Sequence, residues 1–596
     1  TVKHFLGDGG TEHGIDQGNN LASEQDLFDI HAQGYVGGLS EGAQTVMASF
    51  NSWHGEKMHG NRYLLTEVLK DRMGFDGFVV GDWNGHGQIQ GCSNESCSQA
   101  INAGLDVFMV PGAPWKPLLE NTIEQVKSGE IPMARIDDAV SRILRVKLRA
   151  GLFEKNSPAD RPLAGNESII GHPEHREVAQ QAVRESLVLL KNKNGRLPLS
   201  PNINVLVAGD AADNIGKQSG GWSITWQGTR NENADFPGGS SIFAGVKQKV
   251  EAAGGSATLS VDGSYITKPD VAIVVFGEEP YAEGQGDTES IDYQHGNKTD
   301  LILLKSLKEA GIPTISLFIS GRPLWVNPEI NASDAFVAAW LPGSEGSAVS
   351  DLLFKNIDGS PNSEFTGKLS FSWPKRPDQY LLNKGDADYD PLFAYGYGLK
   401  ASEVSQVGDN LPTDFDDLET AVRSQIEILA RKPNANLNEF ISDANGRSLI
   451  SANSSKNAAV TYRTVDKDVQ EDARRIEFNT LGSYGFIAKA PLDIAGMTEQ
   501  GSIVMDVNLL KSPSRPVIIR VGCGEACSKE VDITAQMAAI SLDDQWQRID
   551  IPLICFGLNP EQAQAIVKPF ELIASDLSLE LSGITLKSTS LSLTCD

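Results

Sequence analysis

GFDGFVVGDWNG, residues 74–85, joins an apolar run to an acidic residue. The run Phe78-Val79-Val80 is typical of a strand buried on both faces, and such strands belong to parallel sheets covered by helices. Asp82 stands where the run ends. Reactive groups of α/β folds gather at the carboxyl ends of strands, so Asp82 is a candidate for chemistry. The alternative is an ordinary turn residue or the N-cap of a following helix.

Strand-like and helix-like patterns alternate over residues 1–155. Apolar residues recur at helical spacing in 61–73 and 135–153, and the second segment carries acids first and basic residues later, as the helix dipole favours. A closed (β/α)8 barrel needs about 250 residues, so we expect only the second half of a TIM-like barrel here. The strand-like runs are 1–5, 45–50, 77–82 and 105–111.

The rest of the chain predicts two further domains. A polar linker over 156–186 leads to an α/β sandwich over 187–400, whose strands are expected at 204–209, 271–277, 314–320 and 335–341. After an acidic linker over 401–429, short alternating strands predict an antiparallel, jelly-roll-like β-sandwich over 430–596. The chain begins at Thr1 without a charged-then-apolar leader, so we expect that it has been trimmed or is a fragment.

The formal net charge of the 596 residues is −27. This charge opposes binding to nucleic acid or to an anionic membrane and is compatible with a neutral substrate. No run of about 18 apolar residues predicts a membrane-spanning helix. The composition indicates no particular oligomeric state.

Six cysteines fall into pairs that predict three disulfides and an exported protein, either secreted or periplasmic. The alternative is a zinc site that pools the two short pairs, although neither CSNESC nor CGEAC has the C-x-x-C spacing. The pairs are Cys92 with Cys97, Cys523 with Cys527, and Cys555 with Cys595.

Several blocks stand in a recognisable order along the chain: KHFLGDGG (3–10), VMASFNSWHG (46–55), the opening stretch, SGGWSITWQG (219–228), GEEPYAEGQGD (277–287), SGRP (320–323) and AAWLPGSEG (338–346). Together they resemble glycoside hydrolase family 3, in particular its exo-β-glucanase and β-glucosidase branch. The blocks follow the order of that family from residue 1 to about 400.

The resemblance implies that Asp82 is the catalytic nucleophile and Glu283 the general acid/base. Retaining hydrolysis of a glycosidic bond needs two carboxyl groups about 5–5.5 Å apart, one ionised and one protonated. Asp82 at a strand end suits the attacking role, and a cation such as Lys3 or His4 would keep it ionised. Glu283 lies in a glycine-flanked loop, where shielding by the meeting of two domains would favour the protonated acid. Glu278, Glu279 and Asp287 are competitors for this role by spacing alone.

The resemblance also implies a set of substrate-binding residues. Lys3 and His4 would hydrogen-bond the hydroxyl groups of the sugar that is cleaved off. Trp83 and Trp226 would stack on the two faces of the next sugar. Trp222, Asp8 and Met109 complete the expected set. No metal or cofactor is implied, because the two carboxyl groups supply the chemistry.

The sequence also departs from the family pattern. The residues that the family takes from the first half of the barrel have no counterpart here. Gln17 and Phe50 replace a Glu and a Tyr of plant members, and Asp8 stands where the N-acetylglucosamine branch has a histidine.

From the resemblance as a whole we expect a retaining exo-β-glucosidase or exo-1,3/1,4-β-glucanase acting on β-glucan oligosaccharides.

Three alternatives to this function stay open. The protein could be a related β-glycosidase such as a β-xylosidase, or a non-catalytic glycan-binding protein. A phospho-aspartate protein is a further alternative, since receiver domains also present an aspartate at a strand end. For the C-terminal sandwich we favour a structural or substrate-edge role over a binding module, because its candidate aromatics are only Trp546 and those of 483–486.

Overall fold

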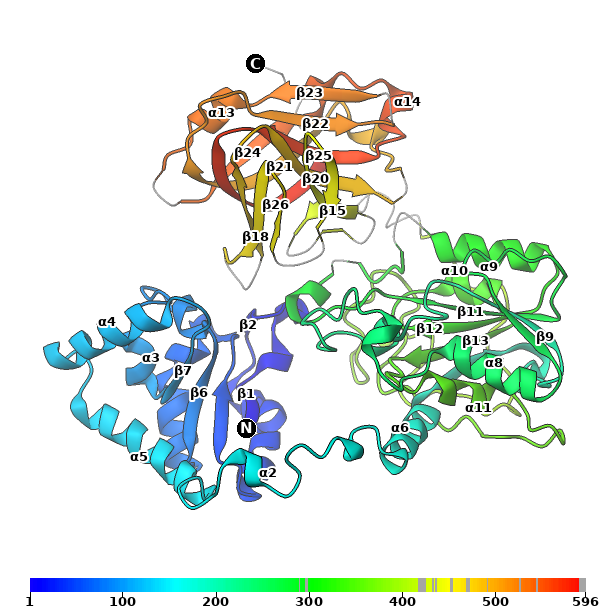
Figure 1. Ribbon diagram of the computed structural model, residues 1–596, viewed down its shortest axis with the longest axis horizontal. Helices are drawn as coiled ribbons and strands as arrows, with labels where there is room; N and C mark the ends of the chain where they lie inside the picture. Colours follow the sequence, from blue (N-terminus) through cyan, green and yellow to red (C-terminus); the bar gives the residue numbers. More distant parts are fainter. Residues whose placement is uncertain are drawn as a thin grey trace. The chain divides into compact units, whose positions relative to one another are not determined.

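The computed structural model forms two compact units, Thr1–Glu167 and Ser168–Asp596 (Figure 1). The first includes residues 1–155, and the second contains both an α/β domain and a β-sandwich. No helix among the described residues is long and apolar enough to cross a membrane. The residues that the structure describes are 1–288, 290–294, 298–415, 425–430, 433–434, 437–450, 454–467, 472–489, 491–524, 527–542 and 545–588.

The first unit is built on a parallel sheet of four strands in the order β1-β3-β6-β7. All four lie at the runs predicted from the sequence, and Val46 and Val79 on the two central strands are fully buried. The sheet is open at β1 and β7, so a closed barrel is not shown and the half-barrel interpretation stays a prediction. The strands are β1 (Val2–Phe5), β3 (Thr45–Ala48), β6 (Phe78–Trp83) and β7 (Val107–Met109).

Helices cover this sheet, and the segment predicted over 61–73 is helical from Tyr63 to Arg72. Its apolar side chains pack into the same core as the buried faces of the strands. The other elements are α1 (Glu24–Asp26), a helical turn at Leu27–His31, α2 (Gln33–Ser40), α3 (Ser98–Ala103), α4 (Trp115–Ser128), α5 (Met133–Arg149), and a small sheet of β2 (Asn19–Asn20), β4 (Ser52–Trp53) and β5 (Glu56–Lys57).

The α/β domain of the second unit is a sheet in the order β10-β9-β11-β12-β13-β8, in which only β8 is antiparallel to its neighbour. Alternate residues of β11 enter two separate cores, with Val271, Ile273 and Val275 on one face and Ala272, Val274 and Phe276 on the other. Helix α8 covers the first face and α9 the second (Figure 1). The predicted sandwich of helices around a buried sheet is therefore confirmed.

The bounds of these strands are β8 (Val188–Asn192), β9 (Asn204–Ala208), β10 (Ser256–Leu259), β11 (Val271–Gly277), β12 (Thr314–Ile319) and β13 (Ala335–Trp340). The helices are α6 (Pro173–Ser186), α7 (Ile215–Ser219), α8 (Ile242–Ala252), α9 (Thr299–Glu309), α10 (Asn327–Ala332) and α11 (Ser350–Leu353).

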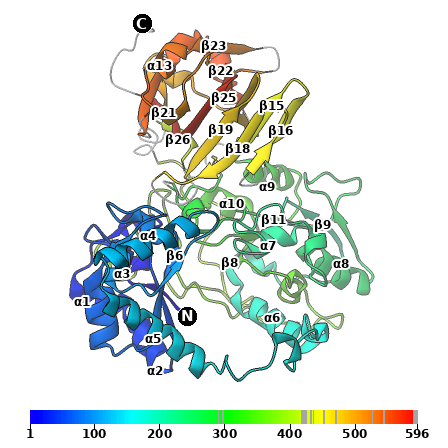
Figure 2. The ribbon, with the colours of Figure 1, turned by 60° about the vertical axis from the view of Figure 1, so that its left-hand side comes forward.

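The C-terminal part is an antiparallel sandwich of two sheets, as predicted (Figure 2). One sheet has the order β17-β18-β19-β26-β21-β24 with β14 beside β26, and the other has the order β16-β15-β20-β25-β22-β23. Tyr484 and Phe486 lie in the core between them, so the aromatics of 483–486 are structural rather than exposed for binding.

Its elements are β14 (Gln425–Leu429), β15 (Leu437–Asp443), β16 (Gly446–Leu449), β17 (Ser454–Lys456), β18 (Val460–Val465), β19 (Ala473–Phe478), β20 (Gly482–Ala488), β21 (Gly501–Lys511), β22 (Ile518–Gly522), β23 (Ser528–Asp532), α13 (Thr534–Ala538), β24 (Gln547–Pro552), α14 (Pro560–Ala563), β25 (Lys568–Ala574) and β26 (Leu577–Ser588).

Both predicted linkers contain regular structure. Helix α6 occupies the end of 156–186, and β14 at the end of 401–429 pairs with β26 of the sandwich.

The sulfur atoms of Cys92 and Cys97 are bonded to each other, as are those of Cys523 and Cys527, so the four thiolates of the zinc alternative are not free to bind a metal. The third predicted pair includes Cys595, which lies outside the described residues.

Candidate active site

Asp82 is the penultimate residue of β6 and lies at the carboxyl edge of the parallel sheet. Its side chain is 16% exposed, and Oδ2 is 3.5 Å from Nε2 of His4 near the end of β1. Oδ1 accepts the backbone N–H of Trp83 at 2.7 Å. The short helical turn that follows, Gly85–Gln88, has Asn84 at its cap position, so Asp82 is not a helix N-cap. Its carboxylate lies instead at the carboxyl end of the strand, at the edge of the sheet where the other strands also end.

The backbone of Asp82 is held by a residue that the sequence analysis missed. Its N–H donates to Nε2 of His59 at 2.9 Å, so this nitrogen is unprotonated and the ring proton lies on Nδ1. His59 is 1% exposed, and this burial lowers its pKa to about 3. Gly81 and Gly85 leave the space for the ring, since a Cβ at Gly85 would lie 2.2 Å from Cε1. The neutral imidazole is thus built into the turn that carries Asp82.

The other predicted residues of the first unit gather at the same edge. Lys3 and His4 belong to β1, and Nδ1 of His4 is 3.8 Å from Oδ2 of Asp8. Met109 ends β7, where its carbonyl accepts the N–H of Asn84 at 3.0 Å. Trp83 is 46% exposed, which leaves its indole available for stacking. One histidine therefore lies between two carboxylates, Asp8 and Asp82, at the predicted place.

Gln17 and Phe50, the two departures noted in the sequence, support the loops around this edge. The side-chain oxygen of Gln17 accepts from Gln88 at 2.8 Å, at the end of the turn that follows Asp82. The backbone carbonyls of Gln17 and Phe50 both accept from Nζ of Lys57, at 3.2 and 3.0 Å. Gln17 is 5% exposed, so its amide contributes to packing inside the unit.

Glu283 of the second unit begins a short helical turn, Glu283–Gly286, in the loop after β11. The residue is exposed and its φ is 52°, a left-handed conformation that is uncommon for glutamate. The N–H of Ala282, just before it, donates to the side chain of Gln227 at 2.8 Å. Beyond Glu283, the carbonyl of Gly286 accepts from Arg322, which also donates to Oε1 of Glu278 at the start of the loop. The loop is therefore held by side chains on either side of Glu283.

Two of the three competitors for the acid/base role are paired with a cation inside the α/β domain. Glu278 is paired with Arg322, and Glu279 lies 3.3 Å from Nζ of Lys217. Both carboxylates are therefore held by a cation within the domain, and the acid/base role of Glu283 stays a prediction from the resemblance.

The tryptophan segment lies against the loop that carries Glu283, because a Cβ at Gly221 would be 2.1 Å from the carbonyl oxygen of Tyr281. Trp222 and Trp226 have ring centroids 6.3 Å apart and ring planes at 54°. The N–H of Trp222 donates to the carbonyl of Trp226 at 2.8 Å, which closes the turn between them, and Trp222 is 68% exposed. Within the second unit the structure thus brings together Glu283 and both predicted tryptophans, while Asp82 and its neighbours gather in the first unit.

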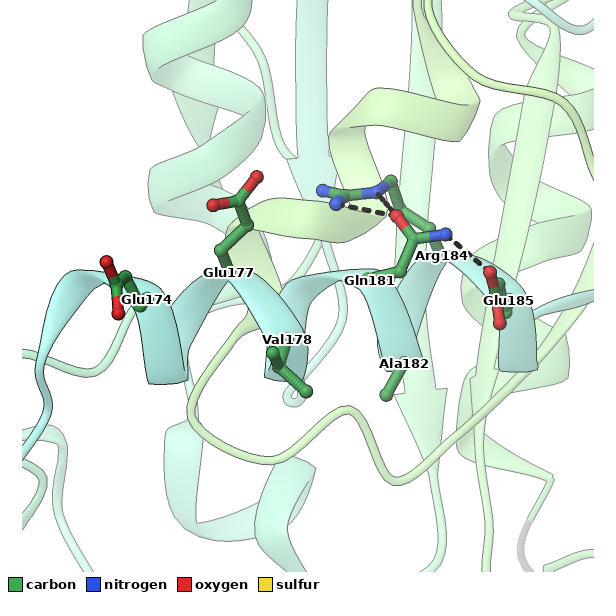
Figure 3. A pocket seen from close by; sticks show the side chains of 7 residues that line it. All are labelled: Glu174, Glu177, Val178, Gln181, Ala182, Arg184 and Glu185. Carbon is green, nitrogen blue, oxygen red and sulfur yellow. Dashed lines mark hydrogen bonds between the residues drawn. The ribbon is translucent and has the colours of Figure 1, made fainter.

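A hollow of about 600 Å³ lies along the outer face of α6 (Figure 3). All of its lining comes from that one helix, and no predicted site residue is among it. Gln181 donates along the helix to Glu185, and Arg184 donates to Gln181 and also to Asp351 outside the helix, so the side chains do not converge on one point. The lining residues are Glu174, Glu177, Val178, Gln181, Ala182, Arg184 and Glu185.

Comparisons with known proteins cover the three parts of the chain. Residues 1–146 match the N-terminal domain of glycosyl hydrolase family 3, residues 187–401 match the C-terminal domain of that family, and residues 438–586 match a galactose-binding domain-like family.

Several relatives share this arrangement. The crystal structure of an exo-1,3/1,4-beta-glucanase from a Pseudoalteromonas species is 44% identical, with a TM-score of 0.67, over 100% of this chain and 73% of that one. The lysosomal beta glucosidase of Dictyostelium discoideum is 31% identical over 67% of this chain and 51% of its own length. The periplasmic beta-glucosidase of Salmonella typhimurium is 28% identical over 69% of this chain and 60% of its own length. The chain thus spans between half and three-fifths of these two curated relatives, and it belongs to glycosyl hydrolase family 3.

Proposed function

We propose that the protein is a retaining, exo-acting β-glucosidase or exo-1,3/1,4-β-glucanase that releases glucose from the non-reducing ends of β-glucans and their oligosaccharides. The observation that carries the proposal is the carboxylate of Asp82, which lies at a strand end beside His4 and is oriented by the backbone N–H of Trp83. The likeness to the Pseudoalteromonas exo-1,3/1,4-beta-glucanase supports the substrate class.

In the first step, a carboxylate oxygen of Asp82 bonds to the anomeric carbon as the glycosidic C–O bond breaks. The carboxyl proton of Glu283 passes to the departing oxygen. In the second step, Glu283 takes a proton from water, whose oxygen bonds to the anomeric carbon as the bond to Asp82 breaks. Two inversions retain the configuration of the sugar, and Glu283 is protonated again.

The flanking residues would bind the sugar. Lys3 and His4 donate to hydroxyl oxygens of the glucose that is released, with Asp8 holding His4 in place. Trp83, Trp222 and Trp226 supply aromatic faces for the next sugar, and Met109 lines the edge of the sheet. A stacked aromatic reads the flat face of a sugar more than its hydroxyl pattern, which suits an enzyme that accepts more than one linkage.

A related β-glycosidase is the second candidate. A beta-xylosidase of Formosa agariphila is 28% identical over 67% of this chain and 59% of its own length. Xylosides lack the hydroxymethyl group of glucosides, so the ratio of kcat/KM for nitrophenyl β-glucoside and nitrophenyl β-xyloside separates the two candidates. We expect the glucoside to be preferred.

We further propose that the protein is exported. Relatives from Salmonella typhimurium and Dickeya chrysanthemi are named periplasmic enzymes, and disulfides persist in the oxidising compartments outside the cytoplasm. The bonded pairs Cys92–Cys97 and Cys523–Cys527 are consistent with that environment.

The mechanism is tested by trapping its covalent intermediate with a fluorinated glucoside whose second step is slow. We expect the label on Asp82 after peptide mapping and none on the Asp82→Asn variant. Asp76→Asn is the matched control, because Asp76 precedes the same strand but its side chain is 54% exposed and paired with Arg149. A label on another residue, or release of the inverted anomer, would refute the proposal.

A further inference from the structure

Arg322 bonds to both ends of the loop that carries Glu283. Its Nε and Nη2 donate to Oε1 of Glu278, at 3.1 and 2.8 Å, where the loop leaves β11. Its Nη1 donates to the carbonyl of Gly286, three residues beyond Glu283. One planar guanidinium thus joins the start of the loop to the turn that presents the proposed acid.

The middle of the loop also lies on this guanidinium. Its central carbon is 4.6 Å from the centre of the Tyr281 ring, and the hydroxyl of Tyr281 donates to Oε2 of Glu278 at 3.5 Å. An arginine stacked on an aromatic face gains a cation–π attraction in addition to its hydrogen bonds. Burial, reinforced by the charge of Glu278, raises the pKa of Tyr281 to about 12, so its hydroxyl stays protonated as a donor.

Arg322 is itself held by the end of β12. Its N–H donates to Oγ of Ser320 at 3.1 Å, and a Cβ at Gly321 would lie 2.9 Å from the hydroxyl oxygen of Tyr281. The side chains of Arg322 and Glu278 are only 27% and 14% exposed. Partial burial of this kind protects an ion pair from the screening that weakens exposed pairs.

We propose that Arg322 is a positioning residue for the general acid, which it directs by fixing Glu278, Tyr281 and Gly286 around Glu283. The inference rests on the acid/base role proposed for Glu283. The left-handed backbone of Glu283 is unfavourable by itself and persists only where its surroundings hold it. Without Arg322 the turn relaxes, and the carboxyl group no longer points at the departing oxygen.

This role predicts a dependence on the leaving group. A sugar leaving group needs a proton from the acid, whereas dinitrophenolate departs without one. We therefore expect Arg322→Met to lower kcat/KM for cellobiose and laminaribiose by about 100-fold, the size of loss that a misplacement of a catalytic group by about 1 Å can cause. The kcat/KM for dinitrophenyl β-glucoside should change little, because nucleophilic attack by Asp82 is intact.

Arg322→Lys guards against a folding defect, since it keeps the charge but loses the planar fork that reaches Glu278 and Gly286 together. We expect the same leaving-group dependence with a smaller amplitude, at an unchanged Tm. Arg184→Met is the matched control. Arg184 also pairs with a carboxylate, that of Asp351 at 3.2 Å, but it belongs to α6 and forms this pair away from the loop 278–286. It should leave both substrates unaffected.

Glu283→Gln is measured beside these variants so that the two hypotheses are separated. One outcome is that Glu283→Gln shows the leaving-group dependence, whereas the Arg322 variants lose the same activity on both kinds of substrate or keep full activity on both. In that case the positioning role of Arg322 is wrong and the acid role of Glu283 stands. If Glu283→Gln itself shows no leaving-group dependence, the proposed acid role is wrong, and the inference on Arg322 is overturned with it.

Discussion

The packing of His59 against the Asp82 turn predicts the effect of one added methyl group. In Gly85→Ala the new Cβ would lie 2.2 Å from Cε1 and 2.4 Å from Nε2 of His59. The ring must move, because carbon atoms do not approach one another so closely. Nε2 is also the acceptor for the N–H of Asp82, so the displacement breaks that hydrogen bond.

Two effects determine how much Gly85→Ala destabilises the protein. Overpacking a buried ring destabilises a protein by about 1–3 kcal/mol. A buried N–H left without an acceptor adds about 1–3 kcal/mol. We expect Gly85→Ala to lower the free energy of unfolding by about 3 kcal/mol, in the lower half of the summed range of about 2–6 kcal/mol. Because the lost bond holds the backbone of the nucleophile, kcat/KM should also fall by about 100-fold.

Urea unfolding and steady-state kinetics measure the two effects, and a double-mutant cycle assigns them. His59→Ala removes the ring, so adding Gly85→Ala to that background should cost far less than it does in the wild type. Gly34→Ala is the control, since its Cβ meets nothing within 4 Å on the exposed surface of α2, and alanine favours a helix by up to about 1 kcal/mol. An equal cost of Gly85→Ala with and without the His59 ring would refute this reasoning.

Two further predictions concern stability. Burial raises the pKa of Glu329 from 4.5 to about 7, so the folded state binds its proton more tightly than the unfolded state, and stability is lost as the pH rises through that interval. Glu329→Gln should therefore raise the free energy of unfolding at pH 8 by up to about 3 kcal/mol and have little effect at pH 4, and an equal effect at both values would contradict this assignment. The disulfide Cys92–Cys97 spans a sequence separation of 5, and replacing both cysteines by alanine should lower the free energy of unfolding by about 2 kcal/mol through the lost loop constraint. Urea unfolding with and without a reductant checks this, since the reductant should destabilise the double variant less than it destabilises the wild type.

The elements that the sequence predicted best are those whose pattern reports burial directly. β11 is an uninterrupted apolar run, and its alternate residues fill two cores because both faces of the sheet are covered. In the first unit β3 follows the same logic, since Val46, Met47 and Ala48 are all buried. The helix at Tyr63–Arg72 could also be predicted, because its buried residues repeat at helical spacing.

The elements that the sequence did not reveal depend on tertiary contacts. α6 has mostly polar residues and buries only Val183, so its pattern reads as a linker. β14 follows an acidic tract and becomes a strand by pairing with β26, at the far end of the sandwich sequence. Tyr484 and Phe486 lie in the core, in line with the structural role favoured for the sandwich, although aromatic residues carry no mark in the sequence that separates a core position from a surface position.

His59 and Arg322, which hold the two proposed catalytic carboxylates in place, can be inferred from the sequence only indirectly. His59 is 23 residues from Asp82, and Arg322 is 39 residues from Glu283, so no local period connects either pair. What the sequence does contain is glycine at the places where these side chains pack against backbone. Gly85 leaves room for the ring of His59, and Gly321, next to Arg322, leaves room for the hydroxyl of Tyr281. Neither glycine has a positive φ in the left-handed region, so conformational freedom does not explain their presence. A glycine near a candidate catalytic acid can therefore mark the space taken by a side chain that supports it, and that side chain comes from a distant part of the chain.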